Sequence, residues 1–106
     1  MSDWINVAKV GEIKPGGHKI VDVDGTLIAV FNLGGEHYAI EDVCTHDGGQ
    51  LTGGTVEGEE IVCPRHGARF CIKTGAALTA PAYEPTATFP VRIENGEIQV
   101  RDARWD

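Results

Sequence analysis

The chain has 106 residues, and its 9 basic and 16 acidic side chains give a formal net charge of −7. This length fits a single domain, and 42% hydrophobic with 24% charged residues excludes wholesale disorder. An acidic chain without a basic cluster binds nucleic acid and anionic membranes poorly. We therefore expect neither nucleic acid nor membrane as a partner, and a basic protein face instead.

The start of the chain and its apolar runs predict a cytoplasmic location. Residues 1–4 contain neither the basic segment nor the apolar segment of a secretion signal. Apolar runs in the sequence fall well short of the roughly 20 residues of a membrane helix. A cytoplasmic protein that is monomeric in solution is the resulting expectation.

The first forty residues carry the signals of antiparallel β-structure. Apolar and polar residues alternate or form short apolar runs, and Asp24-Gly25 and Gly34-Gly35 provide turn signals between them. Strands are predicted over residues 4–7, 18–23, 27–33 and 37–40. The run 27–33 is mostly apolar, as expected of a buried strand.

The C-terminal part repeats this pattern. Strands predicted over residues 89–93 and 98–101 flank Asn95-Gly96, and alternating runs around Asn-Gly are the strongest short-range hairpin signal. Sustained helical spacing of apolar residues is missing from the sequence, so long helices are not expected. Glycine and proline spread along the chain are typical of β-sandwiches and barrels. The predicted fold class is all-β.

Residues 41–83 form a different segment, a loop-rich insert between the β-segments. Strand signals thin out there and glycines cluster. Ordering so many glycines costs conformational entropy, so something must hold these loops. All three cysteines of the chain lie in this insert.

The cysteines and two histidines form two short motifs. The first is Cys44-Thr45-His46, and the second is Cys63-Pro64-Arg65-His66, with sixteen residues between His46 and Cys63. Three cysteines in a chain expected in the cytoplasm argue against a disulfide framework. Two thiols and two imidazoles are suitable ligands for either a tetrahedral zinc ion or an iron–sulfur cluster.

The order of the ligands favours the cluster. Structural zinc sites tend to pair like ligands in each motif, whereas here each motif contributes one cysteine and one histidine. The natural partition places two thiolates on one iron and two imidazoles on the other, which is the ligation of a Rieske 2Fe–2S centre. Zinc bound by the same four residues remains the alternative.

At these four residues the chain resembles the Rieske family. The resemblance implies that Cys44 and Cys63 hold the buried iron, and that His46 and His66 hold the outer iron. It implies a single Rieske-type domain over residues 1–106, an antiparallel β-sandwich or barrel. Its β base would comprise residues 1–40 and 84–106, and its cluster-binding subdomain residues 41–83.

Departures from one branch of the family indicate which branch this chain is similar to. Rieske subunits of respiratory and photosynthetic cytochrome complexes carry a further cysteine in each loop, joined as a disulfide, and this chain has Gly49 and Arg65 there. Those subunits also have serine and tyrosine hydroxyls that bond to cluster sulfur, where this chain has Ala68 and Phe70. The resemblance is therefore to soluble Rieske ferredoxins of ring-hydroxylating oxygenases, with a low reduction potential expected within the family range of about −150 to +300 mV.

The resemblance assigns roles to two further groups. Gly48, Gly49 and Gly67 would let backbone N–H groups approach the cluster sulfurs. The segment 80–82, Ala-Pro-Ala, is similar to the proline-bearing third loop that shields the cluster.

The function implied is one-electron transfer rather than catalysis. The chain would accept an electron from a flavoprotein NAD(P)H reductase and pass it to a terminal oxygenase or another redox enzyme. Motifs for a nucleotide or a second metal site are missing from the sequence. The alternative is a small Rieske-type subunit fixed in a multisubunit reductase such as nitrite reductase.

The remaining candidates have simpler interpretations. Cys71 is expected to be a small buried apolar side chain, and His18 and His37 to be packed or surface residues. Arg65 and Arg69 are either solvated or a positive spot that orients the cluster-bearing tip against a partner. The aromatic residues predicted in the core or at its edges are Trp4, Phe31, Tyr38, Phe70, Phe89 and Trp105.

Overall fold

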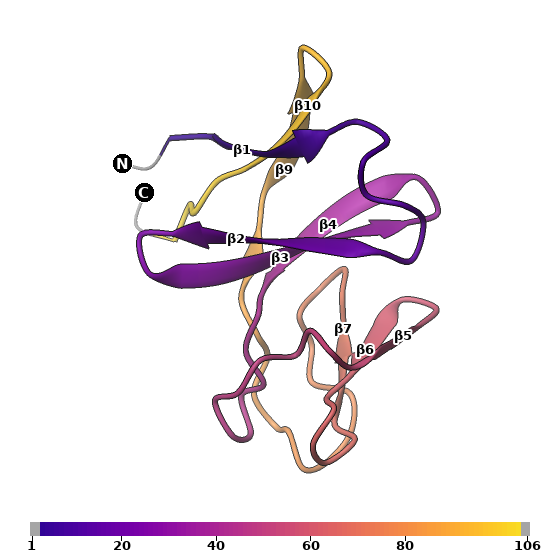
Figure 1. Ribbon diagram of the computed structural model, residues 1–106. Coiled ribbons are helices and arrows are strands. Elements are labelled where there is room, and N and C mark those ends of the chain that lie inside the picture. The colour runs from indigo at the N-terminus through magenta and orange to yellow at the C-terminus, as the bar shows by residue number, and fades with distance from the viewer. Residues whose placement is uncertain (1–2, 105–106) are drawn as a thin grey trace.

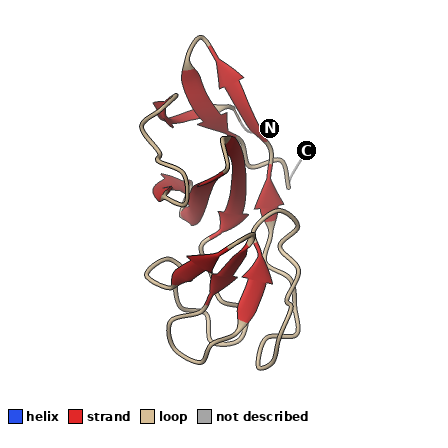
Figure 2. Ribbon diagram, turned by 90° about the vertical axis from the view of Figure 1, so that its right-hand side faces the viewer, coloured by secondary structure: helices blue, strands red, loops and turns tan. Residues whose placement is uncertain are grey.

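The computed structural model describes residues 3–104, which fold into strands, turns and loops without an α-helix (Figure 2). This confirms the all-β fold class. The strands are β1 (Ile5–Lys9), β2 (His18–Val23), β3 (Thr26–Leu33), β4 (Glu36–Glu41), β5 (Thr55–Glu57), β6 (Glu60–Val62), β7 (Arg69–Cys71), β8 (Thr88–Phe89), β9 (Val91–Glu94) and β10 (Glu97–Val100). Residues 3–104 contain no helix that is long and apolar enough to cross a membrane.

Across residues 3–104 the strands form three antiparallel sheets. Their orders are β1-β10-β9, β2-β3-β4-β8 and β5-β6-β7. In Figure 1 the first two sheets, which we call the base, lie above the third sheet and the long loops of the insert. The insert therefore projects from one end of the base.

Three tight hairpins connect strands of the base at the predicted turns, Asp24-Gly25, Gly34-Gly35 and Asn95-Gly96. Val23 pairs with Thr26 across Asp24-Gly25, with φ of 51° and 88° at the two turn residues. Glu94 pairs with Glu97 across Asn95-Gly96, with φ of 52° and 78°. Two-residue turns with both φ values positive match the twist of the flanking strands, and Asx-Gly adopts them readily.

Strand β3 is buried on both faces, which explains its continuous apolar sequence. Ile28 and Val30 pack into the core of the base. Ala29 and Phe31 point the other way, into a second core that also contains Cys44 and Cys63. Successive side chains of a strand alternate between faces, so this one strand joins both cores.

The insert contains a three-stranded sheet that the sequence did not predict. The β5–β6 hairpin pairs Glu57 with Glu60, and Ile61 pairs with Phe70 across β6 and β7. Some of its glycines are required by close backbone contacts. A Cβ added at Gly54 would lie 1.8 Å from the Val62 carbonyl oxygen, where a side chain cannot fit.

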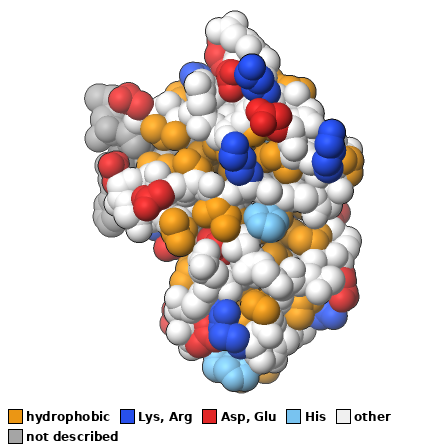
Figure 3. Space-filling view, in the orientation of Figure 1, with side chains coloured by type: hydrophobic (Ala, Val, Ile, Leu, Met, Phe, Trp, Pro, Cys, Tyr) orange, Lys and Arg blue, Asp and Glu red, His pale blue; other side chains and the backbone are white. Residues whose placement is uncertain are grey.

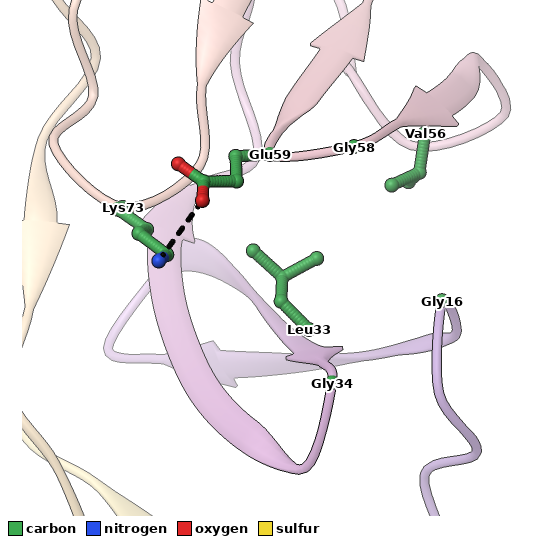
Figure 4. A pocket seen from close by; sticks show the side chains of 7 residues that line it. All are labelled: Gly16, Leu33, Gly34, Val56, Gly58, Glu59 and Lys73. Atoms are coloured by element: carbon green, nitrogen blue, oxygen red, sulfur yellow. Dashed lines mark ion pairs between the residues drawn. The ribbon is translucent and has the colours of Figure 1, made fainter.

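Lys73 of the insert makes an ion pair within the insert and contacts an aromatic ring of the base. Lys73 Nζ lies 3.1 Å from Glu59 Oε2, and 5.4 Å from the centroid of the Tyr38 ring on β4. Figure 4 shows this ion pair beside a groove of about 330 Å³, into which Leu33 and Val56 point. The groove lies away from the four candidate ligands, none of which lines it.

The aromatic residues largely occupy the predicted places. Phe31 and Phe70 are fully buried, and Phe89 is 6% exposed. Trp4 is half-buried at the edge of the base, with the guanidinium carbon of Arg92 4.4 Å from its ring centroid. The prediction for Trp105 lies outside the described residues.

Candidate metal centre

A buried carboxylate closes the base of the first ligand loop. Asp42, just after β4, is 4% exposed. Its Oδ1 accepts the N–H groups of Leu51 at 2.9 Å and Thr52 at 2.8 Å, and its Oδ2 accepts the Thr52 hydroxyl at 2.6 Å. The loop thus begins and ends on one side chain, which satisfies several buried polar groups at once.

The first ligand loop turns tightly around Cys44. The Gly48 N–H donates to the Cys44 carbonyl at 2.7 Å, and the Cys44 N–H donates to the Gly49 carbonyl at 2.7 Å. The backbone N–H groups of His46 and Asp47 point at the Cys44 sulfur. These bonds hold the thiol of Cys44 in place and leave the His46 side chain exposed.

The second ligand loop, between β6 and β7, has the same closure. The Gly67 N–H donates to the Cys63 carbonyl at 3.1 Å, and the Cys63 N–H donates to the Ala68 carbonyl at 2.7 Å. Gly67 has a φ of 75°, a conformation that favours glycine. The second loop thus has a buried thiol at Cys63 and an exposed side chain at His66, as the first loop has at Cys44 and His46.

The two thiols come together inside the second core. Cys44 is 0% and Cys63 is 2% exposed, and their sulfur atoms lie within 4.8 Å of one another. Burial raises the pKa of the Cys44 thiol; the N–H donors lower it, while neighbouring Cys63 adds to the increase. Cys44 therefore stays protonated to higher pH unless a cation stabilises its thiolate.

The two imidazoles lie together at the exposed tip. The rings of His46 and His66 are 5.0 Å apart between centroids and tilted by 62°, and each offers a nitrogen within 4.8 Å of the other. Figure 3 shows a histidine side chain at the lower tip of the molecule, the end formed by the loops of the insert. The structure thus brings together all four residues named from the sequence.

This donor set fits a two-iron centre better than a single zinc ion. The thiols of Cys44 and Cys63 form one set of neighbouring atoms, and the imidazoles of His46 and His66 form another. The four donors of a tetrahedral zinc site would all lie within about 4 Å of one another. Separate thiol and imidazole pairs are the donor chemistry of two thiolates on one iron and two imidazoles on the other.

A carboxylate that was not among the predicted site residues, Asp47, lies close to both pairs. Asp47 has an oxygen within 4.8 Å of the thiols and within 4.8 Å of the imidazoles. Both of its oxygens already accept hydrogen bonds, from the guanidinium of Arg65 and from the Gly49 N–H. Arg65 and then the Gly49 N–H hold the pKa of Asp47 well below its usual range. In the sequence, only its position directly after His46 could have pointed to Asp47 as part of the site.

Arg65 and Arg69, interpreted as either solvated side chains or a positive spot at the tip, both pair with carboxylates. Arg65 is paired with Asp47. Arg69 pairs with Glu57 at 2.9 Å and with Glu60 at 3.4 Å. Each guanidinium is therefore balanced by a neighbouring carboxylate.

The N–H groups of the three glycines make hydrogen bonds within the ligand loops. Gly48 and Gly67 donate to the carbonyls of Cys44 and Cys63, and Gly49 donates to the Asp47 carboxylate at 2.9 Å. These bonds close the turns of the two ligand loops, and the approach of backbone N–H groups to the cluster sulfurs stays a prediction.

A third loop covers the core of the insert. Ala82 is 3% exposed and packs in the same core as the two thiols. The Thr45 hydroxyl donates to the Glu84 carbonyl at 2.6 Å, which fixes this loop to the first ligand loop. Ala68 and Phe70, both fully buried, belong to this core as well. Those two positions thus supply apolar surface and no hydroxyl group.

Cys71 is not the buried apolar side chain that was predicted. It is only partly buried and is not grouped with the other two thiols. Burial raises the pKa of the Cys71 thiol, but hydrogen bonds from the hydroxyl and N–H of Thr74 and from the N–H of Lys73 outweigh it, so the pKa is lowered. Its environment is a polar turn at the end of β7.

Comparisons with known proteins identify the family of this chain. The family model of the Rieske [2Fe-2S] domain matches residues 3–90. The chain is 49% identical over 73 residues to the 3-phenylpropionate/cinnamic acid dioxygenase ferredoxin subunit of Escherichia coli K12, covering 68% of this chain and 69% of that protein. It is 38% identical to the ferredoxin component of naphthalene 1,2-dioxygenase/salicylate 5-hydroxylase systems of Ralstonia sp., over 93% of this chain and 95% of that protein.

Solved structures show the same similarity. A chain from the complex of reduced oxygenase and oxidized ferredoxin in carbazole 1,9a-dioxygenase superposes with a TM-score of 0.87 at 36% identity, covering 92% of this chain and 91% of that one. A chain described as an NADH-dependent nitrite reductase small subunit from Mycobacterium tuberculosis has a TM-score of 0.84 at 23% identity, covering 97% of both chains. The second likeness shows the fold alone. On the matched domain and these relatives, the chain belongs to the Rieske [2Fe-2S] family.

Proposed function

We propose that the chain is a one-electron carrier with a Rieske-type 2Fe–2S cluster, in which Cys44 and Cys63 bind one iron and His46 and His66 bind the other. The observation that supports this most directly is the pair of buried thiols below a pair of exposed imidazoles. The cluster supplies a centre that accepts and releases a single electron. Zinc in the same site is the alternative to be excluded.

The chain's own residues set the conditions around that centre. The core beneath the thiols, which includes Phe70, excludes water from one side. His46 and His66 leave the opposite side open to a partner at the tip. We further propose that residues 41–83 serve as the cluster-binding subdomain of a single domain, with residues 1–40 and 84–106 as its base.

The partners follow from the relatives. Those with more than 30% identity are ferredoxin components of dioxygenase systems, so we infer that a terminal oxygenase receives the electron and that a flavoprotein NAD(P)H reductase provides it. The fixed nitrite reductase subunit is less favoured because its likeness is one of fold. We propose a monomer in the cytoplasm.

Metal analysis and reconstitution test this function. The purified protein should contain about two irons and two acid-labile sulfides per chain, and should pass electrons from a reductase to an oxygenase in a catalytic assay. Stoichiometric zinc without sulfide would contradict the cluster. Loss of transfer activity with an intact cluster would contradict the partners alone, and co-purification only as a fixed reductase subunit would favour the alternative.

The exposed tip suggests how the partner is bound. Tyr83 is 83% exposed and precedes Glu84, whose carbonyl is bonded to the first ligand loop. The Tyr83 ring is therefore available for an aromatic contact with a partner. Substitution of interface aromatics often weakens association strongly.

The change Tyr83→Ala should therefore slow electron transfer to the oxygenase about tenfold and leave the visible spectrum unchanged. The measurement is the transfer rate at subsaturating carrier concentration. Ile93→Ala is the matched control, since Ile93 is 54% exposed on β9 of the base. Equal losses in both variants would show that the contact is not at the tip.

A further inference from the structure

A charged contact joins the two ligand loops directly. Asp47 belongs to the first loop and Arg65 to the second. The guanidinium donates to both carboxylate oxygens, with Arg65 Nη2 3.0 Å from Asp47 Oδ1 and Nε bonded to Oδ2. Two parallel bonds of this kind fix the orientation of both side chains and are stronger than single hydrogen bonds.

Gly49 completes this contact by leaving room for the guanidinium. A Cβ at position 49 would lie 2.7 Å from Arg65 Cζ and 2.8 Å from Nη2, too close to coexist with the present arginine position. The Gly49 N–H donates to Asp47 Oδ1 at 2.9 Å, and its carbonyl accepts the Cys44 N–H at 2.7 Å. The same residue thus contacts the arginine, the carboxylate and the backbone of a proposed ligand.

We propose that Asp47, Gly49 and Arg65 form a non-covalent cross-link, the loop clasp, that holds the two ligand loops together around the cluster. The loop clasp rests on the proposed function, since it needs the cluster that these loops would bind. Arg65 is then a positioning residue, because its guanidinium binds Asp47 of the other ligand loop.

The loop clasp differs from a disulfide in its response to salt. The side chains of Arg65 and Asp47 are 37% and 21% exposed, so dissolved ions reach and screen them. An isolated exposed ion pair contributes little, but this one joins two glycine-rich loops that each carry two proposed ligands. Cluster retention should therefore weaken as ionic strength rises.

Two single variants and their combination test the loop clasp. Arg65→Ala removes the guanidinium, and Gly49→Ala displaces it while leaving its charge present. In each, the cluster should be lost to a chelator about tenfold faster than in the unchanged protein, at the lower end of losses caused by substitutions next to metal ligands. Because both changes break the same contact, the double variant should lose the cluster no faster than either single variant. Visible absorbance gives the rate, and protease cleavage of residues 44–49 gives a second readout.

Salt and a matched control separate the loop clasp from general destabilisation. Raising salt should speed cluster loss in the unchanged protein and have little effect in Arg65→Ala. Arg69→Ala removes an arginine of similar exposure that pairs within the β5–β7 sheet, and its rate should stay unchanged. Additive effects in the double variant, or equal effects of Arg65→Ala and Arg69→Ala, would overturn the loop clasp. An unchanged protein without iron and sulfide would instead overturn the proposed function.

Discussion

Cys63→Ser should abolish the cluster and loosen both ligand loops. Cys63 is 2% exposed and its sulfur lies within 4.8 Å of that of Cys44, so its loss leaves the proposed buried iron with one thiolate from the chain. Serine is a harder and less acidic donor than a thiol, and iron–sulfur clusters are held by thiolates. Since metal binding stabilises the fold of its ligand loops, we expect complete loss of visible absorbance and faster protease cleavage within the insert.

Cys71→Ser is the matched control for that substitution. Cys71 lies in the same insert, but its sulfur is not grouped with the other two. Its variant should keep the visible spectrum and the iron content of the unchanged protein. If Cys63→Ser also kept an unchanged spectrum, the proposed set of ligands would be wrong.

Adding a hydroxyl group beneath the cluster should raise its reduction potential. Ala68 and Phe70 are fully buried in the core that contains both ligand thiols. Hydrogen bonds to cluster sulfur withdraw electron density and make reduction easier, so their absence predicts a midpoint below about 0 mV, within a family range of about −150 to +300 mV. Ala68→Ser and Phe70→Tyr should each raise the midpoint by tens of millivolts.

The measurement is a redox titration followed by visible or electron paramagnetic resonance spectroscopy. A buried hydroxyl without a hydrogen-bond partner lowers the free energy of unfolding by about 1 to 3 kcal/mol. A lower melting temperature would therefore show that the new hydroxyl has not found an acceptor. Ala76→Ser places a hydroxyl outside that core and should leave the midpoint unchanged. A midpoint well above 0 mV in the unchanged protein would contradict the low-potential prediction.

Features encoded by neighbouring residues were predicted well. The hairpins at Asp24-Gly25 and Asn95-Gly96 depend on two turn residues and the alternation beside them. The four candidate ligands also rest on local patterns, because each motif brings a thiol and an imidazole together within three or four residues. Their assignment as ligands stays a prediction.

Features that depend on contacts between distant segments were not predicted. Strands β5, β6 and β7 have three residues each, too few for a periodic pattern, and they are stabilised by pairing with one another. Asp42 closes its loop on Leu51, nine positions away. Arg65 meets Asp47 across 18 positions, a pairing that no local sequence pattern indicates.

The double burial of β3 limits how this protein can be re-engineered. Ala29 and Phe31 of β3 and Ile40 of β4 belong to the hydrophobic core of the insert. Transplanting residues 41–83 onto another scaffold would remove these three side chains from the core of that segment. Replacing them by a short linker would expose Phe31 and Ile40 to water and create an aggregation-prone surface. A portable cluster-binding unit must therefore include β3 and β4.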